Sequence, residues 1–165
     1  MTITTSAYVA VPARAAELGS IIPAGLVFLP ANFESAIPGE DFRFRGEAST
    51  VTKLLAVAGI PVNRLSTGQQ RPAFIHNHSH DWTLPIIFVG TELLKQSPDI
   101  LSAALGVIQD YVIDLFKGVT DARTITAEVV IEDRRAQQYK RLTYEGSPEG
   151  LRELTGAIKA LSRKI

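Results

Sequence analysis

The stretch that decides the fold runs from residue 124 to residue 149 and reads TITAEVVIEDRRAQQYKRLTYEGSPE. From Thr124 to Ile131 apolar and polar side chains alternate, with Val130 on the polar side, as in a strand with one buried face. A polar turn then leads into a second strand that ends near Tyr144, so the two strands form a β-hairpin. Ser147-Pro148-Glu149 supplies an N-cap, a first-turn proline and an acid, which predicts that a helix begins there.

Helical periodicity occurs in three segments of the chain, at residues 48–58, 98–117 and 148–163. Ser97-Pro98-Asp99 opens the longest of them with the same start signal as the C-terminal helix. The first helix should stop at Gly59-Ile60-Pro61, which supplies a left-handed cap, an apolar residue and a proline.

Shorter strands are expected where apolar runs are closed by proline or polar residues, at 7–11, 25–29, 41–45, 60–65, 72–76 and 84–89. A short helical turn fits residues 13–18. In the third strand Phe42 and Phe44 should face the core. We therefore expect a single α+β domain over residues 1–165, in which a mixed or antiparallel sheet is covered by about three helices. If two subdomains exist, residues 118–123 are the best candidate for the boundary between them.

The composition is that of a folded protein, with 45% apolar and 21% charged residues. A chain of 165 residues buries roughly 70% of its unfolded surface, so it needs no covalent cross-links. It has no cysteine, which excludes disulfides, thiolate metal sites and cysteine nucleophiles.

The charge balance bears on partners, because 17 basic and 17 acidic residues give a formal net charge of zero. Without a net field the chain is not expected to bind nucleic acid or an anionic membrane. The most apolar region, Leu84 to Phe116, is interrupted by charges and reads as core, not as a membrane span. No basic residue precedes Arg14 and no long apolar run lies there, so we expect a cytoplasmic protein.

All three histidines of the chain lie at alternate positions in the hexapeptide His76–Asp81. On a strand, residues i and i+2 are about 6.6 Å apart, which lets two imidazoles converge on one ion. His76 and His80 would be about 13 Å apart on a straight strand, so three ligands require a bend, which the intervening turn formers favour. A divalent metal such as zinc could then be held by His76, His78, His80 and Asp81. The alternative is a polar connection between two core strands, with no cofactor.

The hexapeptide resembles the His-x-His-x-Asp-His motif of metallo-β-lactamase-fold hydrolases, with its last two residues reversed as His80-Asp81. Because the chain has no fourth histidine, no catalytic role is carried over. No Gly-x-Ser-x-Gly elbow, dinucleotide fingerprint or phosphate loop occurs either. The sequence thus favours a protein without catalytic activity and leaves a metal-dependent hydrolase as the alternative.

Two arginine pairs suggest a further alternative, a sensor for a small phosphorylated ligand. Arg43 with Arg45, or Arg64 with Arg71, could grip a phosphate between forked guanidiniums. A solvated strand face explains the same residues.

From Ser97 onward, the order helix, hairpin and capped helix, the last as Ser-Pro-Glu-x-Leu-x-x-Leu at 147–154, is similar to the effector-associated constant components of bacterial conflict systems. This resemblance implies an adaptor role in a bacterial defence or toxin system, performed by surfaces instead of a pocket. Together with the charge balance, it leads us to expect a protein-interaction component that forms a homo-oligomer or docks on a protein partner.

Overall fold

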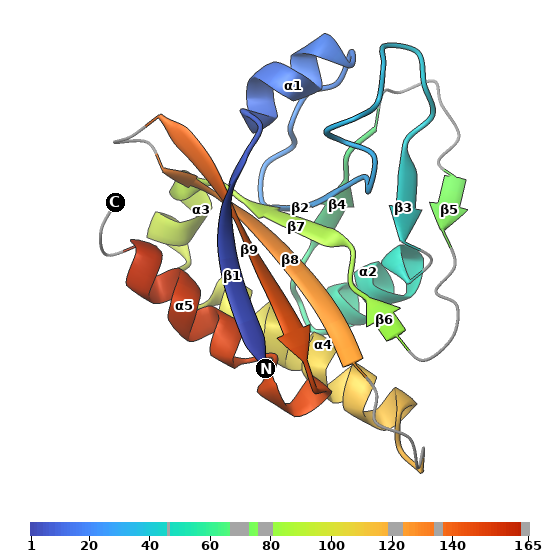
Figure 1. Ribbon diagram of the computed structural model, residues 1–165, viewed down its shortest axis with the longest axis vertical. Coiled ribbons are helices and arrows are strands. Elements are labelled where there is room, and N and C mark those ends of the chain that lie inside the picture. The colour runs from blue at the N-terminus through green and yellow to red at the C-terminus, as the bar shows by residue number, and fades with distance from the viewer. Residues whose placement is uncertain (46, 67–72, 76–80, 119–123, 134–136, 163–165) are drawn as a thin grey trace.

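The computed structural model describes residues 1–45, 47–66, 73–75, 81–118, 124–133 and 137–162 (Figure 1). The expected hairpin lies within the main sheet as β8 (Thr124–Asp133) and β9 (Gln138–Gly146). Their antiparallel register sets Val129 opposite Leu142, and both side chains are buried. The hairpin prediction is therefore confirmed, with each strand extending two residues beyond its expected end.

Val130 departs from the expected alternation, because it is buried on the face that was predicted to be polar. The neighbouring strand β7 (Ile86–Val89) pairs with β8 and sets Phe88 beside Val130 on that face. Phe33, from the loop after residue 30, stacks on Tyr8 on the same side of the sheet. This loop therefore covers part of a face that the local sequence pattern shows as exposed.

The main sheet is mixed, which confirms the α+β class. Over the described residues it has seven strands, ordered β1 (Thr2–Tyr8), β9, β8, β7, β2 (Leu26–Leu29) and β4 (Val62–Arg64), with β6 (Asp81–Thr83) also paired to β8. The pairs β1–β9, β9–β8 and β7–β2 are antiparallel, whereas β8–β7, β8–β6 and β2–β4 are parallel.

β6 and β7 are two halves of one strand that is interrupted at Pro85. Thr83 lies opposite Thr126, but Ile87 lies opposite Val129, so this strand has one more residue than β8 between the two pairs. An extra residue of this kind is a β-bulge, and proline is suited to it because it has no N–H to donate to the ladder. Of the strand predicted at 84–89, the last four residues thus form the regular strand β7.

The three expected helices are present as α2 (Ala48–Val57), α4 (Ile100–Leu115) and α5 (Glu153–Ser162). A 3-10 turn, η1 (Pro148–Gly150), precedes α5, and a short helix that was not expected, α3 (Thr91–Gln96), precedes α4. In Figure 1, α4 and α5 lie behind β1, β8 and β9. No helix in the described part of the chain has both the length and the apolar character needed to cross a bilayer.

The end of α2 follows its sequence signal closely. Gly59 has a φ of 81°, a left-handed conformation that glycine adopts without steric cost. The N–H of Ile60 donates to the carbonyl of Leu55 at 2.8 Å, and that of Gly59 to Ala56 at 3.0 Å. These two bonds form a Schellman motif, so the predicted cap is confirmed.

The N-terminal part differs most from expectation. The strand predicted at 7–11 is instead β1 at residues 2–8, and Val11 already begins α1 (Val11–Glu17), in which Pro12 occupies the first turn. β3 (Arg43–Arg45) pairs with β5 (Ala73–Ile75) in a separate two-stranded sheet. Phe42 and Phe44 are buried, as their spacing predicts.

Candidate functional site

The predicted metal site cannot be assigned a geometry, because His76, His78 and His80 lie outside the described residues. Asp81 begins β6, where its backbone pairs with Thr124, and its side chain is likewise outside the description. Among the described residues, no group of three or more potential ligands from His, Cys, Asp and Glu could hold a metal. The histidine site stays a prediction from the sequence.

The arginines of the predicted phosphate site have other contacts. Arg43 forms an ion pair with Glu40 at 3.0 Å on the surface. The guanidinium of Arg64 lies 5.9 Å from the centre of the Phe44 ring, a cation–π contact. Arg71 lies outside the described residues. The structure therefore gives Arg43 and Arg64 partners within the protein, and the phosphate site stays a prediction from the sequence.

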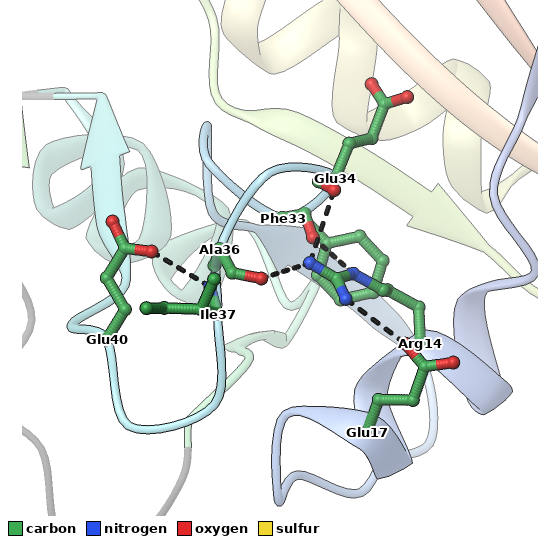
Figure 2. A network of polar contacts seen from close by, with 7 residues as sticks. All are labelled: Arg14, Glu17, Phe33, Glu34, Ala36, Ile37 and Glu40. Carbon is green, nitrogen blue, oxygen red and sulfur yellow. Dashed lines mark hydrogen bonds and ion pairs between the residues drawn. The ribbon is translucent and has the colours of Figure 1, made fainter.

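Arg14 of α1 binds the loop that follows β2 (Figure 2). Its guanidinium donates to the carbonyl oxygens of Phe33 at 3.0 Å, Glu34 at 3.2 Å and Ala36. A planar fork of donors suits several carbonyls at once. These bonds fix the loop against α1 and hold Phe33 over the sheet, so Arg14 has a structural role.

The same loop is closed at its other end by Glu40. Its carboxylate accepts the N–H of Ile37 at 2.9 Å (Figure 2). This backbone bond, followed by the bond from Arg43, lowers the pKa of Glu40. The loop is thus held by Arg14 of α1 at one end and by the local bonds of Glu40 at the other.

Arg141 of β9 is the centre of the polar cluster on the sheet face that this loop adjoins. It pairs with Glu34 at 3.2 Å and Glu128 at 4.0 Å, and lies 5.6 Å from the Tyr8 ring centre. Burial raises the pKa of Tyr8, and the nearby Glu34 and Glu128 raise it further. The phenol therefore stays protonated at physiological pH, and the guanidinium of Arg141 lies close to two carboxylates. Such a cluster stabilises the fold and offers no activated nucleophile or base.

The outer edge of β1 differs from this cluster, because its backbone polar groups have no neighbouring strand among the described residues. β1 pairs with β9 over seven consecutive residues, Thr2 to Tyr8, and no strand of the described residues pairs with its other side. In an antiparallel pair every second residue points its N–H and C=O away from the partner strand. β1 therefore presents a row of unpaired backbone donors and acceptors. In Figure 1 it lies at the front, on the outside of the sheet.

The side chains of β1 leave this edge accessible. The strand contains no charged residue and no proline, and five of its seven residues are exposed. Sequence reasoning missed it because neither face carries a continuous stripe of large apolar residues. Its signal is the β-branched run Thr2 to Thr5, which favours a strand without showing alternation.

A shallow hollow of about 420 Å³ lies where the second half of β1 pairs with the start of β9. Among the described residues that line it, Lys140 is the only charged one. The lining residues are Thr5, Ser6, Ala7, Tyr8, Ala10, Gln137, Gln138, Tyr139 and Lys140.

A second hollow, of about 390 Å³, lies between the start of α4 and α5. Leu101 and Ile158 form its apolar floor, and Lys159 lies 3.9 Å from Asp99 across it. The hydroxyl of Thr155 is buried beside it and has no hydrogen-bond partner in the described part of the chain. Because the hydroxyl oxygen is closed off from solvent, it is not available to bind a ligand in the hollow. This hollow is therefore a weaker candidate binding site than the β1 edge.

Comparisons of the chain with protein-family models, curated proteins and solved structures found no match. The interpretation of the site therefore depends on its own geometry.

Proposed function

We propose that this chain is a cytoplasmic, non-enzymatic protein-interaction component that takes an extended strand of a protein partner onto the free edge of β1. The observation that supports it is the edge itself, which is seven residues long and free of charge, proline and bulges. Strand addition to an exposed sheet edge is a common mode of protein recognition, in which the backbone hydrogen bonds provide affinity.

The contrast between the two ends of the sheet supports the same proposal. At the far end, β4 has only three residues, one of which is Arg64. Short edge strands and edge charges are devices by which natural proteins prevent unwanted strand pairing. β1 has neither, although an unguarded edge of this length carries a risk of aggregation. A docking function explains why an edge of this length is unguarded.

The resemblance of residues 97 onward to effector-associated constant components suggests the biological system in which the chain acts. In that setting the chain would act as an adaptor in a bacterial defence or toxin system. The resembling part includes β9, the strand on which β1 is built.

The test is a titration of the isotope-labelled protein with a capped heptapeptide of alternating threonine and valine, followed by NMR. Shift changes confined to β1 and the adjoining part of β9 are expected. Thr4→Lys, which guards the edge with a charge, should abolish them, whereas Thr50→Lys on the exposed surface of α2 should not. No shift at up to roughly 1 mM peptide, or binding that Thr4→Lys leaves intact, would overturn the proposal.

A further inference from the structure

Resting on the proposed function, we infer that the strand which β1 receives is β1 of a second copy of this chain. The two strands pair antiparallel about a two-fold axis at Thr5, which joins the two sheets into one. The inference names the partner, and three features of the described residues support it.

The first feature is the register. A two-fold axis perpendicular to the sheet keeps the helices of both copies on one side, and directly opposed residues then share a face. The register that uses all of β1 sets Thr5 opposite its own counterpart and Thr4 opposite Ser6 of the second copy. It also sets Ile3 opposite Ala7 and Thr2 opposite Tyr8. The whole length of β1 is thus paired, as it is with β9.

The second feature is the chemistry of these pairs. Threonine and serine pairs across neighbouring strands are favourable, whereas like charges directly opposite are unfavourable. β1 contains no charge, so no pair in the two-fold register is repulsive. The formal net charge of zero also means that two copies do not repel each other at long range.

The third feature is an exposed apolar residue that lies next to the edge. Met1 is 70% exposed, among the few large apolar side chains left in solvent. In the two-fold register it lies opposite Val9 of the second copy. Pairing would thus cover Met1 in both copies.

Sedimentation velocity of the full chain tests the inference, because the axis passes through Thr5. The unmodified chain should change from monomer to dimer as its concentration rises from roughly 5 to 500 µM. Thr5→Lys and Thr5→Glu each place like charges face to face and should weaken dimerisation roughly 30-fold or more. An equimolar mixture of the two variants should restore a dimer, now with opposite charges across the axis. Thr50→Lys is the matched control and should behave as the unmodified chain.

Thr5 is exposed, so at roughly 5 µM, where the unmodified chain is mainly monomeric, the urea midpoints of its variants should match that of the unmodified chain. Should a Thr5 variant fail to fold, the double variant Thr4→Glu/Ser6→Lys takes its place. The acidic side chain at position 4 of one copy then faces the basic side chain at position 6 of the other, so this variant should dimerise. Thr4→Lys/Ser6→Lys sets like charges face to face and should not.

A chain that stays monomeric over the whole range, or a mixture that does not recover the dimer, would overturn the inference. If such a monomer still binds the threonine–valine peptide at β1, only the identity of the partner is wrong. If the peptide also fails to bind, the proposed function fails as well.

Discussion

Replacing Arg14 with alanine should lower the free energy of unfolding by about 3–4 kcal/mol. Arg14 donates to the carbonyl oxygens of Phe33, Glu34 and Ala36, and its side chain is only 18% exposed. A hydrogen bond to a charged group contributes about 1.5–3 kcal/mol, but bonds made by one side chain are not additive. Because the bond to Glu34 is exposed, the total corresponds to about two such bonds.

Urea unfolding followed by circular dichroism measures this loss. Arg43→Ala is the matched control, because its ion pair with Glu40 is largely exposed and should contribute under about 1 kcal/mol. Arg14→Lys keeps the charge without the fork of donors and should lose about 2 kcal/mol. An Arg14→Ala loss within about 0.5 kcal/mol of the Arg43→Ala loss would refute the reasoning.

Three further changes have expected outcomes that urea unfolding can measure. Gly150→Ala should lower the free energy of unfolding by roughly 2 kcal/mol, because the new methyl group would collide with the buried Tyr144 hydroxyl. Gly156→Ala has open space around it in α5 and should raise the free energy of unfolding by roughly 0.5–1 kcal/mol. Equal effects of the two substitutions would contradict this packing. Thr155→Val should stabilise by about 1 kcal/mol by removing a buried hydroxyl without a partner, and a loss would mean that the hydroxyl is bonded. The raised pKa of Tyr8 means that above pH 10 the unfolded chain releases a proton that the folded chain keeps, so stability should fall there by up to about 1.4 kcal/mol per pH unit. Tyr8→Phe should reduce this slope, and an unchanged slope would assign it to other groups.

The elements that the sequence predicts well carry their own local signal. The hairpin is visible because one face of β8 is apolar at every second residue from Ile125 to Ile131. α4 is visible because its apolar stripe is wide, and α2 because Gly59 and Pro61 mark its end. In each case the buried face and the stop signal lie within one segment.

The elements that were missed depend on distant partners. β1 is a strand because β9 pairs with it, and its own side chains are mostly exposed on both faces. Val130 is buried by β7 and the loop after β2, which the alternation within β8 does not reveal. The free edge of the sheet is likewise a property of strand order, because it exists only where no further strand follows β1.

The candidate site shows the same division. Sequence reasoning concentrated on histidine, the residue type with the most distinctive chemistry, whereas the proposed binding edge is made of backbone groups that any residue carries. Thr2 to Tyr8 could have drawn attention only by the absence of charge and proline in a β-branched run.

Residue-resolved amide hydrogen exchange of β1 tests the central claim most directly. At roughly 5 µM the amides of Thr2 to Tyr8 should alternate between protected and unprotected, since only every second one faces β9. At roughly 500 µM the unprotected set should become protected in the unmodified chain and stay unprotected in Thr5→Lys. The same exchange pattern at both concentrations, with alternate amides of β1 open to solvent throughout, would contradict pairing at this edge.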